Sequence, residues 1–294
     1  MKNNYKLLRE NCARIIETNL NGREFLSIKS FKDFDKEIRK QRDLRFYKYL
    51  RPDYYAIRNF ETNQLMCSNP KKFNDIFEGM VNSDDLKPED TKPIIEKACN
   101  AVSISCFSER WDNLLMYAHY TNSFKGFCLE YDFGLIVDSI LSQMYFFPVI
   151  YHAQPCTLAR MNELSGDIDH IMSKMESGSI ITEKVDDLIS YFIHKVSIWE
   201  YEKEWRFIIP ISQYWNFFKN KDVHADYHFI QGFDCVSAVY LSPNIDRVIK
   251  EHLCDIVKRK NKVRVAEHKA PIDVFQTSMK RTSYKLEGNR IELD

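Results

Sequence analysis

The stretch that decides the fold is residues 199–210, which read WEYEKEWRFIIP. From Glu202 onward it alternates as a strand does, because successive side chains of a strand point to opposite faces. This spacing predicts that Glu202, Glu204 and Arg206 share one face, and that the apolar run after them is buried until Pro210 ends the strand. Charges on a buried strand are costly unless they are paired. The pattern therefore predicts either a structural ion pair at a sheet edge or a catalytic or ligand-holding carboxylate that Arg206 orients.

The composition is that of a globular protein. The 294 residues fit one large domain or two small ones. Hydrophobic residues make up 44% and aromatic residues 14% of the chain, which excludes a disordered protein. The formal net charge of +0 gives no sign of a protein that coats nucleic acid through bulk charge.

Cysteine, glycine and apolar patterns narrow the class of protein further. The eight cysteines contain no C-x-x-C pair and the first residues show no apolar signal segment, so we expect reduced thiols and a cytoplasmic protein. The most apolar long stretch, residues 144–151, is too short to span a bilayer, and no membrane partner is expected. No glycine motif of the Rossmann or P-loop type is present, although NAD bound in another way stays open.

The hydrophobic periodicity predicts an α+β protein with one domain boundary. We expect a helical N-terminal extension over residues 1–43 and an α+β domain over residues 44–294, built on a single mixed, mainly antiparallel sheet with flanking helices. Strands are expected at residues 45–50, 64–68, 101–107, 126–131, 145–151, 202–209, 236–241 and 262–266. Helices are expected at residues 53–60, 91–100, 113–120, 182–198 and 242–258. Residues 154–180 are low in apolar pattern and are expected to be a surface excursion, and residues 213–229 are expected to be irregular.

Five short motifs occur in a fixed order along the chain. They are YKY at 47–49, FNDIFE at 73–78, MYAHY at 116–120, KGFC at 125–128 and WEYEKEWR at 199–206. Together they resemble a widespread bacterial family of unknown function with an FNDPFE loop, an MWSHYA helix and a YExEWR strand, and the resemblance covers about residues 44–267. The sequence departs from that pattern at Ile76, at Tyr117-Ala118, and at Phe124, where the family often has a histidine.

The expected strand order is in turn similar to the ADP-ribosyltransferase-like fold, which includes DarT-type toxins that modify DNA. This resemblance implies an ADP-ribosyltransferase-like protein that uses NAD as a substrate without a metal. It would be a toxin or anti-phage defence effector acting on a nucleic-acid or protein acceptor. Such transfer breaks the nicotinamide–ribose bond through a state with positive charge on the sugar, which a fixed carboxylate stabilises.

The resemblance assigns roles to residues in the five motifs. Glu204 would be the fixed carboxylate, Tyr47 or Lys48 the polar group that holds a ribose, and Tyr117 or Tyr120 the partner of the nicotinamide ring. The catalytic candidates are Glu204, Tyr47 and His119. The candidates for substrate binding are Lys48, Asn74, Asp75, Tyr117, Tyr120, Glu202 and Arg206.

Two other functions remain open at this point. A metal-dependent hydrolase or nuclease would need hard ligands that converge, and the chain offers Asp75, Glu78, His119 and Glu204. A non-catalytic binding module of a defence system would use the same residues structurally. In that module the Asn74-Asp75 loop would cap a helix, His119 would be a satisfied core histidine, and the glutamates would pair with Arg206 and Lys48.

Overall fold

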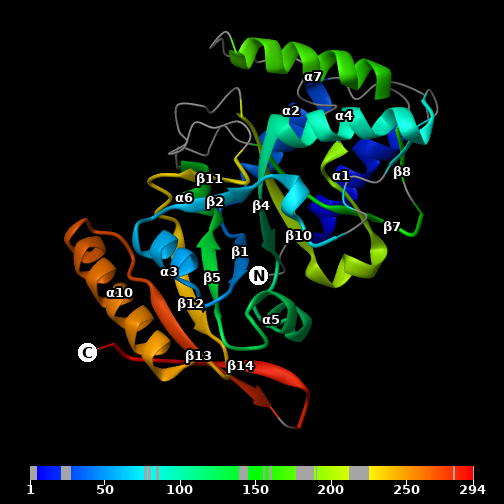
Figure 1. The fold of residues 1–294 in the computed structure, drawn as a ribbon. Coiled ribbons are helices and arrows are strands. Elements are labelled where there is room, and N and C mark those ends of the chain that lie inside the picture. The colour runs from blue at the N-terminus through cyan, green and yellow to red at the C-terminus, as the bar shows by residue number, and fades with distance from the viewer. Residues whose placement is uncertain are drawn as a thin grey trace.

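The computed structural model shows one large sheet with helices packed around it (Figure 1). It describes residues 5–20, 28–75, 78, 81–83, 86–138, 145–154, 156–158, 161–176, 189, 191–211, 225–280 and 282–293. The helices are α1 (Tyr5–Leu20), α2 (Ile28–Ile38), α3 (Tyr54–Glu61), α4 (Pro88–Ala101), α5 (Leu114–Tyr120), α6 (Phe133–Asp138), α7 (Met161–Glu176) and α10 (Arg247–Ala266), with 3-10 helices η1 (Pro70–Lys72) and η3 (Ser197–Glu202). The strands are β1 (Arg45–Leu50), β2 (Leu65–Ser68), β3 (Val81–Ser83), β4 (Val102–Ser108), β5 (Phe127–Asp132), β6 (Tyr145–Pro148), β7 (Ile150–His152), β8 (Cys156–Leu158), β9 (His194–Val196), β10 (Glu204–Pro210), β11 (Tyr227–Ile230), β12 (Val236–Leu241), β13 (Asp273–Lys280) and β14 (Lys285–Arg290).

The large sheet is mixed and mostly antiparallel, as the sequence predicts. Within the described residues its order is β11-β2-β4-β1-β5-β12-β13-β14, and β10 and β6 extend it from β4. Strands β12 and β13 run parallel, while the other neighbours in this sheet run antiparallel. Among the described residues, β6 pairs in this sheet with β10 and ends at Pro148, and a proline suits such an edge strand because it cannot donate to a central ladder.

Strand β4 is the point at which the sheet divides. Strand β10 pairs with one edge of β4 over its whole length, from Glu204 opposite Ser108 to Pro210 opposite Val102. On the other edge β2 meets β4 at Ile104, whereas β1 meets it at Ser108. Strands β1 and β2 therefore pair with this edge of β4 at two separate points. The edge of β4 between those points, beside Cys106, is a gap in the sheet.

The main core lies around β10, which is buried at all of its positions. Phe207 stacks on Phe146 with ring centres 4.3 Å apart, and Phe46 packs against Trp205 at 5.1 Å. A strand buried in this way has to satisfy its polar side chains within the protein. The carboxylate and guanidinium of β10 must therefore find partners there.

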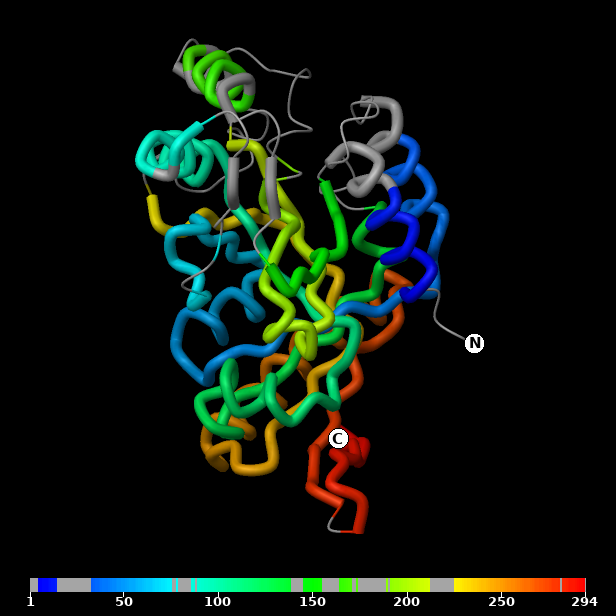
Figure 2. Tube along the Cα trace, turned by 90° about the vertical axis from the view of Figure 1, so that its right-hand side faces the viewer, coloured from blue at the N-terminus to red at the C-terminus, as the bar shows by residue number. Residues whose placement is uncertain are grey.

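The N-terminal helices pack on the same core, beside β6 (Figure 2). Phe34 of α2 stacks on Phe147 at 5.5 Å. Arg9 of α1 reaches further: it donates to the Glu109 carboxylate at 2.6 Å and to the backbone carbonyl groups of Val149 and Glu204 at 2.8 and 2.9 Å. One side chain of α1 thereby links the end of β4, the β6–β7 junction and the start of β10.

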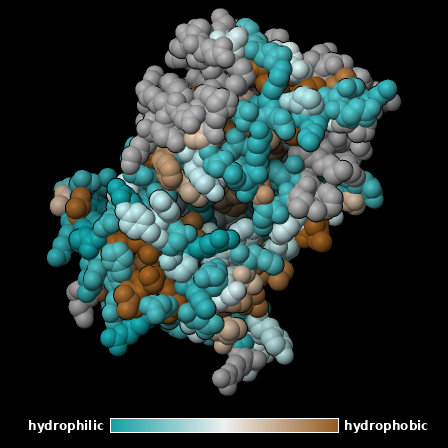
Figure 3. Space-filling model, in the orientation of Figure 1, coloured by the Kyte–Doolittle hydropathy of each residue, from teal (hydrophilic) through white to brown (hydrophobic). Residues whose placement is uncertain are grey.

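The C-terminal part of the fold differs from the expectation. Residues 262–266 are not a strand, because α10 continues to Ala266. Their alternation was misleading, since Val263 and Val265 are exposed while Arg264 is buried and bonds to Asp234. Strands β13 and β14 were not expected, because most of their positions are exposed or half-buried and lack an apolar alternation. The face of the molecule drawn in Figure 3, in the orientation of Figure 1, is mostly hydrophilic. Apolar side chains gather at its lower left, beside α10.

Three other segments also correct the sequence-based expectations. Residues 161–176 form α7, and residues 227–230 form β11 on the edge of β2, where irregular chain was expected. The expected helix at 182–198 ends differently, because residues 194–196 form β9 and η3 follows directly. The first part of that helix, residues 182–188, lies outside the described residues. No helix in the described ranges is long and apolar enough to cross a membrane.

Candidate functional site

A cavity of about 930 Å³ lies at the gap in the sheet. Its walls come from β1, β2, β4, β5, α3, α5 and η1, and from residues at the start of β10. This volume is within the range of small-molecule binding sites. Seven of the predicted site residues line it: Tyr47, Lys48, Asn74, His119, Tyr120, Glu202 and Glu204.

Three predicted site residues lie away from the cavity wall. Tyr117 is fully buried and packs edge-on against Tyr49 at 5.0 Å, so it has no free face for a ligand ring. Asp75 is buried at 5% exposure outside the wall. Arg206 is fully buried behind Glu204 and acts through it. The interpretation of Tyr117 as a ring partner therefore does not fit this fold.

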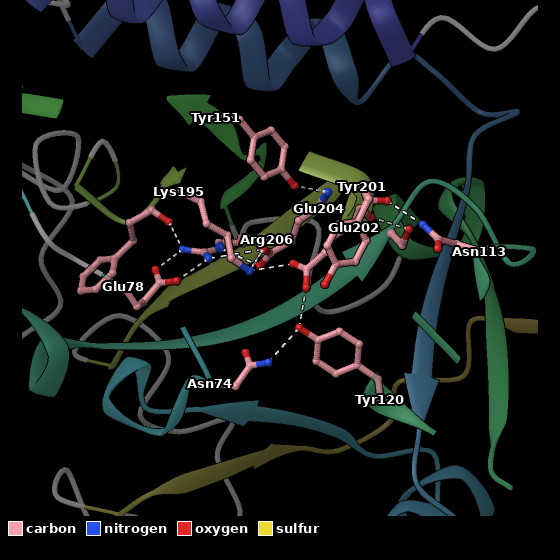
Figure 4. Close-up of polar contacts among 12 residues, drawn as sticks. Asn74, Glu78, Asn113, Tyr120, Tyr151, Lys195, Tyr201, Glu202, Glu204 and Arg206 are labelled. Carbon is pink, nitrogen blue, oxygen red and sulfur yellow. Dashed lines mark hydrogen bonds and ion pairs between the residues drawn. The ribbon is translucent and has the colours of Figure 1, made fainter. Parts of the chain in front are cut away.

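Arg206 is the centre of a buried ion-pair network (Figure 4). Its Nε donates to Glu204 Oε1 at 2.8 Å, and its two terminal nitrogens donate to the two oxygens of Glu78 at 2.6 and 2.9 Å. Nη1 also donates to the carbonyl of Phe192 at 2.6 Å. A two-point guanidinium–carboxylate contact is among the strongest in proteins. Arg206 thus fixes both Glu204 and the loop that carries Glu78.

Lys195 joins the two carboxylates of the 199–210 stretch, and the sequence interpretation missed it. Its ammonium lies 2.6 Å from Glu202 Oε2 and 3.0 Å from Glu204 Oε2 (Figure 4). All three side chains are 5% exposed or less. Lys195 projects from β9, within a segment whose periodicity had predicted a helix. The only sequence signal for its role was a lysine close ahead of the glutamates.

Glu202 and Glu204 do not lie on one strand, so the predicted alternation from Glu202 is wrong in its first step. Helix η3 ends at Glu202, Lys203 takes a left-handed conformation with φ 46° and ψ 50°, and β10 begins at Glu204. A non-glycine residue adopts that conformation at a cost of roughly 1–2 kcal/mol. The turn still brings both carboxylates to the same ammonium group.

The two carboxyl groups have pKa values shifted in opposite directions. For Glu204 burial favours the neutral acid, but the charges of Arg206 and Lys195 outweigh it and hold the pKa well below its usual range. For Glu202 burial, and then the negative charge of Glu204, raise the pKa although Lys195 opposes the shift. Burial alone would lower the pKa of Lys195, but the two glutamates raise it, so this lysine stays charged. Of the two carboxyl groups, Glu202 is therefore the one that takes up a proton more readily, while Glu204 is held ionised.

Tyr120 and Asn74 connect Glu202 to the cavity wall opposite. The Tyr120 hydroxyl donates to Glu202 Oε1 at 2.5 Å, and the amide of Asn74 donates to that hydroxyl at 3.2 Å (Figure 4). Burial, and then the Glu202 charge, raise the pKa of Tyr120, so the phenol keeps its proton. Asn113 caps α5, and its amide donates to the carbonyl of Tyr201 at 2.6 Å, which ties the helix to η3.

Tyr47 and His119 line the cavity without contacting the carboxylate pair in a recorded hydrogen bond. Tyr47 leaves β1 on the opposite face from Lys48, and its ring packs edge-on against Tyr240 at 6.2 Å. The ring of His119 lies 6.4 Å from that of Trp199 and 6.2 Å from that of Tyr201. The structure thus brings both residues to the cavity, with Glu202 and Tyr120 at its polar end.

The candidate metal ligands are engaged in other contacts. Glu78 and Glu204 both bind Arg206, so a guanidinium occupies the place where a cation would have to sit. Among the residues that the structure describes, no three His, Cys, Asp or Glu side chains gather to hold a metal ion.

A family model described as a protein of unknown function, DUF2971, matches residues 116–207. This segment runs from α5 to β10 and contains Tyr120, Lys195 and both carboxylates. No curated protein and no solved structure matches the chain significantly. The chain is thus similar to a family of uncharacterised proteins over the part that forms the polar end of the cavity.

Proposed function

We propose that the protein is an enzyme that transfers the ADP-ribosyl group of NAD, with Glu202 as its acid–base group. The observation that supports this most is the pair of carboxyl groups in one cavity with oppositely shifted pKa values. Such a split is the usual sign of two carboxylates with different catalytic roles. The structure supports keeping Glu204 as the fixed carboxylate, because Arg206 and Lys195 hold it ionised, and giving Glu202 the acid–base role in addition.

Each residue then has a defined task in the transfer. Anionic Glu204, on the far side of Lys195, adds negative potential where positive charge develops on the ribose. The bond from ribose to nicotinamide breaks, and nicotinamide leaves with the bonding electrons. The acceptor hydroxyl or amine forms the new bond to the ribose carbon and gives its proton to ionised Glu202. Tyr120 orients that carboxylate from one side.

Other side chains that line the cavity are of the types that bind a dinucleotide. Tyr55, Phe73 and Tyr227 contribute aromatic faces to the wall, on which planar rings stack, while Arg51 contributes positive charge suited to a pyrophosphate. The finer parts of this proposal are an ADP-ribosyltransferase-like fold and a cytoplasmic toxin or defence effector with a nucleic-acid or protein acceptor, and they rest on the resemblance drawn from the sequence motifs.

The test measures nicotinamide release from NAD by the purified protein and by Glu202→Gln, Glu204→Gln and Glu200→Gln. Glu200 is the matched control, because it lies on η3 beside Glu202 but is half-exposed and paired with Lys203. We expect Glu202→Gln to lose about 10²–10⁴-fold in rate, as for a lost general base, with little change in melting temperature. Glu200→Gln should keep the parent rate.

Three outcomes would contradict the proposal. A Glu202→Gln protein with the parent rate removes the acid–base role. Release that requires added Mg²⁺ and stops with a chelator points to a metal-dependent hydrolase. Absence of both NAD binding and nicotinamide release from the folded parent protein points to a binding module.

A further inference from the structure

Lys48 carries a half-buried positive charge that lies on the cavity wall, outside the ion-pair network. Its ammonium donates to Ser105 Oγ at 2.8 Å and to the carbonyl of Cys106 at 3.1 Å, and it lies 5.2 Å from the centre of the Phe107 ring. These contacts fill the gap that β1 and β2 leave beside β4. An ammonium has three N–H donors, so one of them has no acceptor within the described part of the chain.

The charge of Lys48 is uncompensated by any described carboxylate in ion-pair contact, and burial lowers the pKa of its ammonium. Lys72 on the same cavity wall is different, because its ammonium lies 2.9 Å from Asp226. Lys195 likewise has two carboxylates. An unpaired buried charge is costly to the fold, and in a cavity it marks a candidate binding site.

The wall around Lys48 is apolar. Leu129 is its direct partner across the β1–β5 pairing and projects from the same face of the sheet. Helix α3 and strand β2 close this part of the cavity from the other side. The apolar side chains that line it are Leu50, Phe60, Leu65, Ile104, Phe107 and Leu129.

We propose that this apolar end of the cavity, formed by Lys48 and these six side chains, binds an organic carboxylate with an apolar body. The carboxylate accepts the third N–H of Lys48, and the body covers the apolar wall. A single charge with one unused donor suits a carboxylate better than a phosphate dianion, which needs more donors. This site does not depend on the chemistry proposed for Glu202, because its contacts are made by other residues.

The test is calorimetric titration of the parent protein, Lys48→Met and Lys72→Met with benzoate and with octanoate. Benzamide serves as the uncharged analogue and inorganic phosphate as the alternative anion. Methionine keeps the apolar stem of lysine and removes the charge, while Lys72→Met is the matched control on the same wall. We expect at least one of the two carboxylates to bind the parent and Lys72→Met with equal affinity. Its binding to Lys48→Met should be at least tenfold weaker, and benzamide should bind the parent at least tenfold more weakly than benzoate.

Thermal unfolding of Lys48→Met controls for folding, and its melting temperature should stay close to that of the parent, because the loss of the unpaired charge offsets the loss of the hydrogen bonds to Ser105 and Cys106. Four results would overturn the site. They are no binding of either carboxylate to the parent, equal carboxylate binding by folded Lys48→Met, benzamide binding as tight as benzoate, or phosphate binding tighter than both carboxylates.

Discussion

The two ends of the cavity bury charge in opposite ways. At the polar end three glutamates alternate with Lys195 and Arg206, and each charged group contacts at least one of the opposite sign. At the apolar end Lys48 has only a hydroxyl, a carbonyl and an aromatic ring. Paired charges hold Glu204 and Glu78 in place, while the pKa of Glu202 is raised by burial and by the charge of Glu204. The charge of Lys48 holds no carboxylate in place, and in our proposal it gains a favourable ion pair only when a ligand supplies a carboxylate.

The largest difference between the two ends should appear in stability. Arg206→Met leaves Glu204 and Glu78 buried without their common partner, and such breaks cost about 3–5 kcal/mol. Lys48→Met should change the free energy of unfolding by about 1 kcal/mol or less, because the loss of the unpaired charge offsets the loss of the hydrogen bonds to Ser105 and Cys106. Urea unfolding of both variants measures the two free energies. Equal decreases in the free energy of unfolding for Arg206→Met and Lys48→Met would contradict this difference between the two ends of the cavity.

Arg9→Met tests whether the polar end depends on helix α1. The change removes three donated hydrogen bonds and leaves the Glu109 carboxylate with Trp205 Nε1 as its recorded donor. We expect a loss of about 2–3 kcal/mol, the range for buried groups left unsatisfied. Lys6→Met on the same helix is the control, because that side chain is 91% exposed and should change the unfolding free energy by less than about 0.5 kcal/mol. Indistinguishable curves for the two variants would show that α1 is not coupled to β10.

The pH dependence of the free energy of unfolding should report the lowered pKa of His194, which precedes Lys195 on β9. Burial, followed by the charges of His152 and Arg206, lowers the pKa of His194 to about 3. As pH falls below about 6.5, the histidine of the unfolded chain becomes protonated, while His194 of the folded protein stays neutral until about pH 3. The free energy of unfolding therefore decreases over this range, by up to about 1.4 kcal/mol per pH unit. Unfolding at pH 7, 6 and 5 measures this slope, and His194→Gln should flatten it. A slope unchanged by His194→Gln would assign the effect to another group.

Tyr120→Phe should have a small effect on stability, about 1 kcal/mol for one hydrogen bond. The phenol lowers the pKa of Glu202 by donating to its ionised form, so its loss should raise that pKa further. The acidic limb of the pH–rate profile for nicotinamide release should therefore move to higher pH. A profile that keeps its position would separate Tyr120 from the acid–base step.

Local sequence patterns predicted the strands that surround the site. Strands β1, β4, β5 and β12 have apolar runs or alternation that mark them without knowledge of the rest of the chain. The contact of Glu204 with Arg206 was also predictable, since residues two apart on a strand share a face. These features depend on a few consecutive residues only.

The partners of these residues could not be predicted in the same way. Arg206 meets Glu78 across 128 positions of sequence, and Lys195 reaches the glutamates only because β9 replaces the end of an expected helix. The surroundings of Lys48 depend on where β1 and β2 separate along β4, which no single segment encodes. Tertiary pairing therefore decided the charge balance of the cavity.

The contacts of Arg9 also have a consequence for the order of events during synthesis. Arg9 and the carbonyl of Glu204 are separated by 195 positions. A ribosome adding roughly 5–20 residues per second needs on the order of 10–40 s to make the chain between them. During this interval β10, to which Arg9 donates a hydrogen bond, has not yet been synthesised. The side chains of Leu8 and Cys12 on α1, which are buried in the folded protein, are then not yet fully covered. The helix that is made early is thus secured late, and a nascent chain halted before β10 presents this apolar face to chaperones and proteases.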